Sequence, residues 1–302
     1  TTGFILGELR NVIVTLVVNG TANDDVITVH VNNGNLEVIN TDTGNPTPPA
    51  ATTTRSFFGL TSGTNVAIDL TVNSLGGNDT LIVDYSDGFF EANITYVAGA
   101  EADLLQVIGE STDAVAGTVA SYLPDLGSAT DGLLTTRENA LAAVSNVIDF
   151  QGSTSVEVNG FAAVTMTTPG DEDTVTLSGA VGPVSADGAI RIAGTSGVNA
   201  FAPLFLANTV TVDIDLATSD TAINNVDQVT LNPGALQANE LLGDLSVSTG
   251  QGRDEFTLNE DDFRGFGGVD NQVLSLDAGT DTNALTVDLT TAAAGTLDEV
   301  RL

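Results

Sequence analysis

The feature that most constrains this chain is a degenerate fourteen-residue repeat that recurs along its 302 residues. Each copy begins with two apolar residues separated by one other residue and continues with six residues that usually include Gly. It ends with Asp or Asn followed by two more alternating apolar residues. A unit this short cannot bury its own apolar face, so its copies must stack on one another. The copies that fit without a gap are residues 16–29, 70–83, 94–107, 164–177, 245–258 and 274–287.

Apolar residues that alternate with polar ones predict strands with one buried face, and Gly, Asn and Asp between two such strands are typical of turns. Each copy is therefore predicted to form a strand, a corner and a second strand. The residue at the tenth position, in the corner, is Asp25, Asp79, Asp103, Asp173, Asp227, Asp254 or Asn283.

The spacing of these corner residues predicts the architecture. The interval from Asp79 to Asp103 is 24, and the intervals that end at Asp254 and Asn283 are 27 and 29. The intervals that begin at Asp25 and Asp173 are both 54, which is twice 27. These values are typical of the coils of a parallel β-helix or β-solenoid. Tandem β-sandwich domains are the alternative, because they also contain many short strands bounded by turns.

The corner residues also indicate a tandem duplication. Asp25 and Asp173 are 148 residues apart, and the same spacing separates Asp79 from Asp227. We therefore expect two β-repeat units, residues 1–150 and residues 151–302.

Three segments interrupt the repeat. Pro residues between positions 45 and 49 exclude a central strand, because Pro has no N–H for the ladder, and we interpret residues 41–56 as a loop excursion. Residues 136–149 place Leu141, Val144 and Ile148 at helical spacing after a capping box, which predicts a short helix. Residues 235–242, after a Pro, predict a second one.

The composition excludes several classes of partner and chemistry. Asp and Glu number 40 against 7 Lys and Arg, and the net charge of −33 repels nucleic acid phosphates and anionic lipid surfaces. Hydrophobic residues make up 42% of the chain, so it is expected to fold rather than stay disordered. No apolar run approaches the ~20 residues of a transmembrane helix. The chain has no Cys, which excludes thiolate chemistry and disulfides.

One corner resembles a known calcium-binding motif. Residues 76–81, Gly-Gly-Asn-Asp-Thr-Leu, resemble the nonapeptide of the repeats-in-toxin family, whose pattern is Gly-Gly-x-Gly-x-Asp-x-apolar-x. The resemblance implies a parallel β-roll in which corner Asp residues and backbone carbonyls coordinate Ca²⁺. This chain departs from the pattern, because no copy is complete and the interval between its closest corners, Asp79 and Asp103, is 24 rather than nine. We therefore expect isolated calcium sites rather than a regular ladder.

Closely spaced oxygen ligands at the corners suit Ca²⁺, which takes about six to eight of them. The alternative is that each corner Asp accepts hydrogen bonds from backbone N–H groups in an Asx turn. The candidate metal ligands are Asn23, Asp24, Asp25, Asn78, Asp79, Asp103, Asp171, Asp173, Asp254, Asp261 and Asp262.

A second resemblance covers about half of the chain. Residues 70–80, Leu-Thr-Val-Asn-Ser-Leu-Gly-Gly-Asn-Asp-Thr, and residues 17–29 are similar to phrases that recur in Gly-Asn-Asp-Thr-rich repeat proteins of bacterial cell surfaces. The resemblance implies a secreted, extracellular β-solenoid that serves as a scaffold or adhesive protein. It names no ligand.

Catalytic side chains are scarce in this sequence. Polysaccharide lyases and hydrolases also use parallel β-helices, and they need paired carboxylates or a basic residue near the scissile bond. The seven basic residues are all Arg and follow no repeat, and His30, the one imidazole, lies in an alternating strand with its side chain on the polar face. The chain also has no Trp to stack on a sugar. We therefore expect no enzyme activity and rank a polysaccharide-degrading enzyme last.

Two noncatalytic functions remain. In the first, the chain is a structural subunit of a cell-surface fibre, filament or matrix, because uncapped strand edges at the ends of a solenoid pair head to tail with another copy. In the second, it is the stalk or binding module of a calcium-dependent adhesin that presents a loop to a cell-surface or matrix partner. The repeat itself favours the first.

Overall fold

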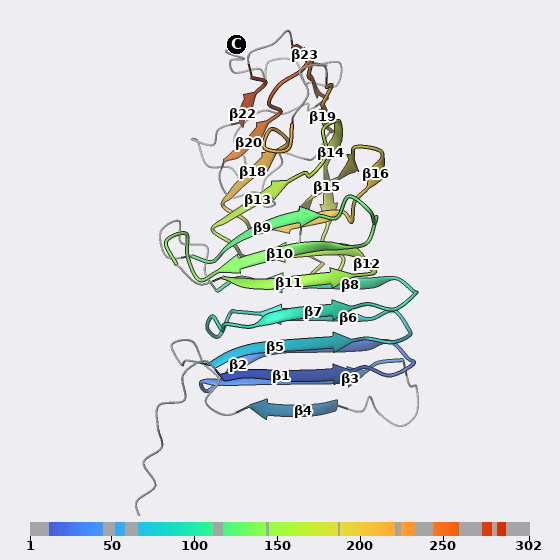
Figure 1. The fold of residues 1–302 in the computed structure, drawn as a ribbon, viewed down its shortest axis with the longest axis vertical. Coiled ribbons are helices and arrows are strands. Elements are labelled where there is room, and N and C mark those ends of the chain that lie inside the picture. Colours follow the sequence, from blue (N-terminus) through green and yellow to red (C-terminus); the bar gives the residue numbers. More distant parts are fainter. Residues whose placement is uncertain are drawn as a thin grey trace, which may run out of the picture.

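The computed structural model contains strands and turns, and no helix among the residues that it describes. The prediction of an all-β protein is therefore confirmed. Figure 1 shows the strands arranged in a tall stack, with the chain climbing from β1 at the bottom to β23 at the top. The described residues are 12–44, 52–57, 66–110, 117–142, 145–186, 188–220, 225–232, 244–259, 274–279 and 283–287.

Two large mixed sheets, here named sheet A and sheet B, face each other. Sheet A contains, in spatial order, β1 (Val12–Asn19), β5 (Val66–Asn73), β7 (Asn93–Val97), β11 (Asn146–Gln151), β10 (Gly132–Arg137), β9 (Val119–Pro124), β13 (Ala163–Thr167), β18 (Thr211–Asp215), β20 (Leu245–Ser248) and β22 (Leu274–Asp277).

Sheet B contains twelve strands on one path, and β16 (Asn199–Ala200) pairs beside β15. Their spatial order is β23 (Ala284–Val287), β21 (Glu255–Leu258), β19 (Gln228–Leu231), β14 (Asp173–Val181), β15 (Gly188–Ser196), β17 (Leu204–Ala207), β12 (Ser153–Asn159), β8 (Asp103–Ile108), β6 (Thr80–Asp84), β2 (Asp25–Asn32), β3 (Asn35–Asp42) and β4 (Thr52–Phe57).

Each copy of the repeat contributes its first strand to sheet A and its second strand to sheet B. In residues 16–29 these are the end of β1 and the beginning of β2, and in residues 164–177 they are β13 and β14. Strands of successive copies pair in parallel, as β1 does with β5 and β2 does with β6. The corner residue therefore lies at or just before the beginning of a strand in sheet B.

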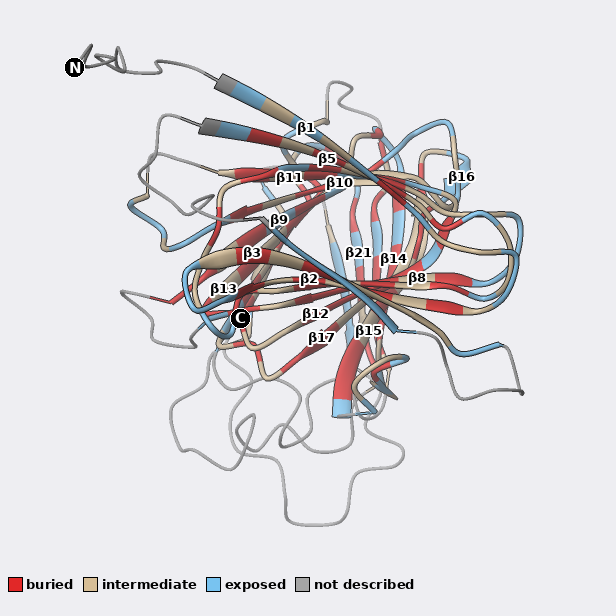
Figure 2. Ribbon diagram, turned by 90° about the horizontal axis from the view of Figure 1, so that it is seen from below, coloured by how far each residue is buried: buried red, intermediate tan, exposed pale blue. Residues whose placement is uncertain are grey.

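The alternating apolar residues fill the space between the sheets. Ile27, Leu81 and Leu105 occupy matching register positions in β2, β6 and β8, and each is at most 1% exposed. Figure 2, a view along the stack, shows buried residues alternating with more exposed ones along the strands of both sheets. Burying one such side chain stabilises the fold by roughly 1.5–3 kcal/mol, so stacking supplies what a single copy lacks.

The predicted helix at residues 136–149 is wrong. Residues 132–137 form β10 and residues 146–151 form β11, and the two strands pair antiparallel with Leu134 opposite Ile148. Both of these side chains are fully buried, whereas Leu141 is 88% exposed. Alternation within each strand therefore decides the structure, and the helical spacing was accidental. The second predicted helix, at residues 235–242, lies outside the described residues.

The predicted loop excursion at residues 41–56 is partly wrong. Residues 41–42 end β3, and residues 52–57 form β4, which pairs antiparallel with β3. Strand β4 is the edge of sheet B and is rich in β-branched Thr, a residue type that strands favour. Residues 45–51, which hold the Pro cluster, lie outside the described residues.

Each of the two long intervals between corners corresponds to one step of the stack rather than two. Strand β2 pairs directly with β6, although Asp25 and Asp79 are 54 residues apart. Strand β14 likewise pairs directly with β19, although Asp173 and Asp227 are 54 residues apart. The extra residues include an antiparallel partner strand, β3 in the first half and β15 in the second. In both halves, the strand after the first corner therefore has a parallel neighbour from the next copy on one side and an antiparallel neighbour on the other. The boundary at residue 150 remains a prediction.

Candidate functional site

The corner residues form a ladder that joins successive steps of the stack. In the first half, the backbone N–H of Asp25 donates to Oδ1 of Asp79 at 2.7 Å, and the N–H of Asp79 donates to Oδ1 of Asp103 at 2.7 Å. All three side chains are at most 1% exposed. The carboxyl groups of Asp79 and Asp103 therefore each satisfy a buried N–H in the neighbouring copy, as buried donors require.

The second half repeats the ladder with one more member. The N–H of Asp173 donates to Oδ1 of Asp227 at 2.8 Å, and the N–H of Asp227 donates to Oδ1 of Asp254 at 3.1 Å. The N–H of Asp254 then donates to Oδ1 of Asn283 at 2.8 Å. An amide thus serves at one corner where the others have a carboxyl group, so accepting this hydrogen bond needs no negative charge.

At three corners the second carboxyl oxygen, Oδ2, accepts a hydrogen bond from a nearby residue of the same copy. Thr168 donates its hydroxyl to Oδ2 of Asp173 at 2.5 Å, and Thr249 does the same for Asp254 at 2.8 Å. In both cases the Thr lies five residues before the Asp. At the first corner the backbone N–H of Thr21 donates to Oδ2 of Asp25 at 2.5 Å instead. A Thr at this spacing is a sequence signal for a closed corner, and the fourteen-residue pattern does not include it.

Burial makes several of these carboxyl groups weak acids. It raises the pKa of Asp79 to about 6 and that of Asp227 to about 8, against the hydrogen bonds that lower them. Burial also raises the pKa of Asp103 and of Asp173. A protonated carboxyl group is a poor ligand for a cation, so the pKa of about 8 favours hydrogen bonding over metal binding at Asp227.

A second, more exposed set of contacts lies outside the ladder. Asp24 accepts the N–H of Asn78 at its Oδ1 (2.7 Å), and the side-chain oxygen of Asn78 accepts the N–H of Ala102 (3.2 Å). Asn23 donates its side-chain amide to Oδ2 of Asp42 (3.2 Å). Three neighbouring candidates, Asn23, Asp24 and Asp25, therefore bind different partners and do not converge on one ligand.

The remaining candidates are also dispersed. Asp171 is exposed while Asp173, two residues on, is buried in the ladder. Asp261 and Asp262 lie outside the described residues. Within the described part of the chain, no three His, Cys, Asp or Glu side chains gather as metal ligands. Asp227 and Asn283, which complete the ladder, were not among the predicted ligands. Calcium binding at the other corners stays a prediction.

The corner hydrogen bonds are of the kind that the Asx-turn alternative predicted, but their principal partner lies in the neighbouring copy. Close backbone approach is needed for this, and Gly77 shows it. Its φ is +107°, and a Cβ atom there would lie 2.4 Å from the carbonyl carbon of Asn23. A side chain at this position would separate the two copies.

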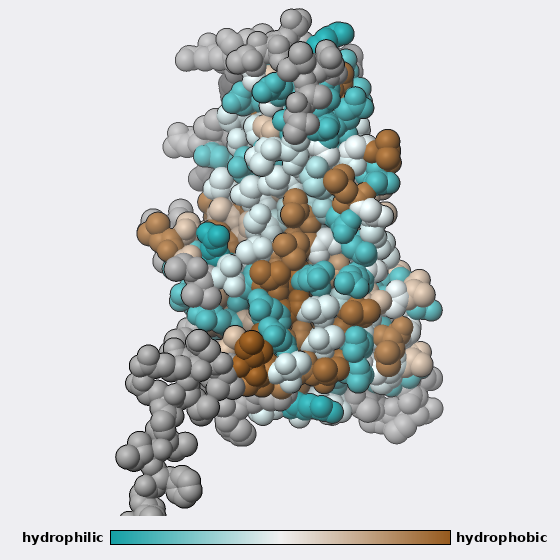
Figure 3. Space-filling view, in the orientation of Figure 1, coloured by the Kyte–Doolittle hydropathy of each residue, from teal (hydrophilic) through white to brown (hydrophobic). Residues whose placement is uncertain are grey.

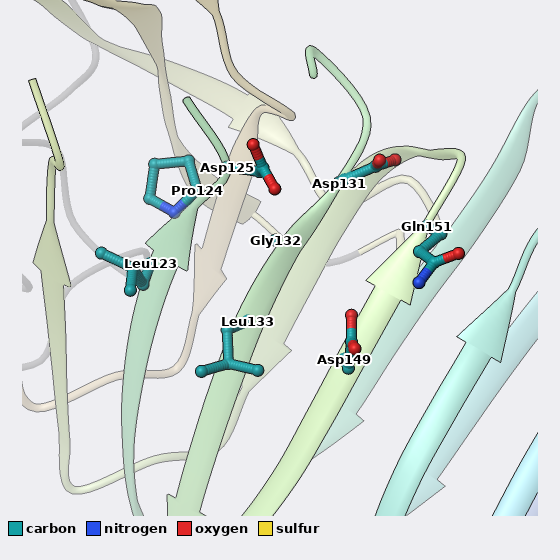
Figure 4. Close-up of a pocket in the computed structure, with 8 residues that line it drawn as sticks. All are labelled: Leu123, Pro124, Asp125, Asp131, Gly132, Leu133, Asp149 and Gln151. Carbon is teal, nitrogen blue, oxygen red and sulfur yellow. The ribbon is translucent and has the colours of Figure 1, made fainter. Parts of the chain in front are cut away.

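A shallow pocket of about 320 Å³ lies on the outer face of sheet A. Figure 4 shows Asp125 and Asp131 at one end of it, and Leu133 and Asp149 side by side on the paired strands β10 and β11 toward the other end. Asp131 is already occupied, since its Oδ1 accepts the N–H of Gly152 at 2.8 Å. The lining includes no Arg or His, so the pocket offers acidic groups without a basic partner.

His30 lies on the outer face of sheet B, where its Nε2 is 3.6 Å from Oε2 of Glu37 on the paired strand. Hydrogen bonds from Ser56 and Asn32 lower the pKa of Glu37, and His30 adds a smaller effect. The pair joins β2 and β3. The absence of enzyme activity stays a prediction.

Comparison with protein-family models, with curated proteins and with solved structures gives no match for this chain. Among the described residues, there is no helix with the length and apolar character to cross a membrane.

Proposed function

We propose that the chain is a β-solenoid that acts as a structural subunit of an extracellular fibre or matrix, adding copies head to tail. The observation that carries the proposal is that both edges of sheet A are first strands of copies of the same repeat, β1 in residues 16–29 and β22 in residues 274–287, and that these strands run in the same direction. The parallel pairing of strands from successive copies favours a solenoid over tandem β-sandwiches.

The directions of the end strands support head-to-tail addition. Following the pairings through sheet A, β1 and β22 run the same way, because β10 alone is reversed. In sheet B, β4 and β23 also run the same way. Strands β3 and β15 are each antiparallel to both of their neighbours, so the strands on either side of each one run in the same direction. A copy placed on the end of another would therefore extend both sheets with parallel pairs, a heterologous contact that gives an open filament.

The side chains at the two ends also suit each other. Leu16 and Val18 on β1 occupy the first and third positions of the repeat, as Leu274 and Leu276 do on β22. Leu274 and Leu276 are only partly buried, although they pack against the core. Figure 3 shows apolar side chains over the lower and middle part of the face that sheet A presents. Stacking would bury apolar surface left over at each end.

Electron microscopy and sedimentation of the purified chain test the proposal. Unbranched fibres that lengthen with protein concentration are expected. Leu16→Asp, which puts a charge on the edge strand, should prevent them, and Leu141→Asp, which adds the same charge at an exposed turn, should not. Folding of both variants is checked by their thermal melts. Monodisperse wild-type monomers at high concentration would contradict the proposal.

A further inference from the structure

Three oxygen atoms at the first end of the stack are buried and have no hydrogen-bond partner: Oδ1 of Asp25, Oδ1 of Asn40 and Oδ1 of Asp42. They belong to β2 and β3, which pair antiparallel with Asp42 directly opposite Asp25 and Asn40 opposite Ile27. Residues opposite each other share a face of the sheet, and alternate residues of one strand do too. All three side chains therefore lie on the inner face of sheet B.

The other oxygens of the two carboxyl groups are already engaged. Oδ2 of Asp25 accepts the N–H of Thr21 at 2.5 Å, and Oδ2 of Asp42 accepts the side-chain amide of Asn23 at 3.2 Å. These contacts fix both side chains and leave one oxygen of each without a donor. Asp25 is 0% exposed, so its Oδ1 is out of contact with bulk solvent. Two facing carboxyl groups with unpaired buried oxygens are costly unless a positive group joins them.

The second half of the chain shows how the same corner is completed without a cation. There Ser196 lies opposite Asp173, where Asp42 lies opposite Asp25, and Gly194 takes the place of Asn40. The N–H of Gly197 donates to Oδ1 of Asp173 at 3.2 Å. The first corner has two extra oxygen ligands and lacks this donor.

We propose that Asp25, Asn40 and Asp42 form a binding site for one Ca²⁺ ion at the first end of the stack. Carboxylate and amide oxygens are the ligands that Ca²⁺ prefers, and its flexible coordination tolerates an irregular set completed by carbonyls or water better than Mg²⁺ does. The site differs from the ladder, in which the corner oxygens accept backbone N–H groups. It lies within one chain and is independent of fibre formation.

One of the three residues, Asn40, borders a pocket. This pocket of about 260 Å³ lies between the edges of the two sheets and is also lined by Val18, Thr21 and Arg55. Arg55 forms no ion pair with a described residue, so Asp25 and Asp42 have no described cation to neutralise them. The net charge of −33 raises the local concentration of divalent cations.

Isothermal titration of the full chain with Ca²⁺, in physiological KCl and excess Mg²⁺, tests the site. The wild type should bind one Ca²⁺ per chain and melt at a higher temperature with Ca²⁺ than with EGTA. Asp42→Ser and Asp42→Asn should each weaken this binding by about tenfold or more and should melt in EGTA no lower than the wild type, because they remove the facing carboxylate. Asp149→Ser, an exposed change of equal charge, is the control.

Two results would overturn the proposal. The first is Ca²⁺ binding that is absent, or that Asp149→Ser weakens as much as Asp42→Asn does. The second is a wild-type melting temperature that Ca²⁺ does not move but that falls with rising pH, with no such fall in Asp42→Asn. That result would show that Asp25 and Asp42 share a proton instead of a metal ion.

Discussion

The corner at Asp25 and the corner at Asp173 begin equivalent strands, yet only at Asp173 do both carboxyl oxygens have a hydrogen-bond donor. Both donate their backbone N–H to the next carboxyl group along the stack. Asp173 also receives donors at both of its own oxygens, from Thr168 and Gly197, whereas Oδ1 of Asp25 has none. The repeat therefore specifies the ladder at both corners, and the residues beside the paired strand differ: the N–H of Gly197 closes the second corner, and Asp42 faces the first.

Breaking the ladder itself should have the largest effect, and an equal one in both halves. Asp79→Ala removes the acceptor for the N–H of Asp25, and Asp227→Ala removes the acceptor for Asp173. Each should lower the free energy of unfolding by about 1–3 kcal/mol, because a buried donor loses its partner. Urea denaturation at about pH 5, with Asp149→Ala as the exposed control, measures this. A loss no larger than the control's would show that the ladder does not stabilise the fold.

A smaller effect is expected from Thr168→Val, which keeps the shape of the side chain but removes the hydroxyl that donates to Asp173. The free energy of unfolding should fall by about 1 kcal/mol. Thr249→Val should do the same at Asp254, since its hydroxyl makes the matching contact. The Asp25 corner offers no equivalent variant, because position 20, five residues before Asp25, is Gly. If the free energy of unfolding is unchanged in both variants, the Thr hydroxyl does not stabilise the corner.

Ser196→Asp sharpens the comparison by placing a carboxylate opposite Asp173, as Asp42 lies opposite Asp25. Like charges directly opposite on paired strands destabilise by roughly 0.2–1 kcal/mol, and we expect a loss in that range in EGTA. The matching Asn cannot be added, because a Cβ at Gly194 would lie 1.7 Å from the carbonyl oxygen of Thr174. A stabilised Ser196→Asp variant would show that facing carboxyl groups are not the feature that separates the two corners.

The smallest effect at acidic pH should come from Asp227→Asn. The raised pKa of Asp227, about 8, means that the folded state keeps a proton that the unfolded state releases. Its contribution to stability is therefore complete below about pH 4 and is lost as the pH rises toward 8. Asn imitates the protonated form, as Asn283 does in the ladder, so the variant should match the wild type below about pH 4 and become increasingly more stable than it as the pH rises toward 8. Identical pH profiles from denaturation would contradict this.

Much of the strand pattern could be predicted, because alternation reports burial directly. The pattern of residues 164–177 predicted a strand, a corner and a second strand, and the structure has β13 and β14 at these positions. The same reasoning failed at residues 136–149, where three apolar residues matched a helix by chance. One of them, Leu141, points into solvent. A short match to helical spacing has little weight where two alternating strands explain the same residues.

The partners of the corner residues could not be predicted. The acceptor for the N–H of Asp25 is 54 residues away and that for Asp79 is 24 residues away, so the local sequence contains neither. We interpreted each interval of 54 residues as two coils, and therefore did not predict the antiparallel strands β3 and β15 within these intervals. For that reason Asn40 and Asp42, which follow no motif, were not among the predicted calcium ligands, although Asp25 was.

The central claim is that the corner carboxyl groups are buried members of a hydrogen-bonded ladder. A pH titration of the Asp227 side-chain carbon by NMR, in full-length protein labelled at Asp, tests it most directly, with Asp227→Asn to assign the signal. The account predicts a midpoint near pH 8, because burial raises the pKa of this group to about 8. A midpoint near the ordinary Asp value of about 4 would show a solvated or cation-bound carboxylate and would contradict the ladder.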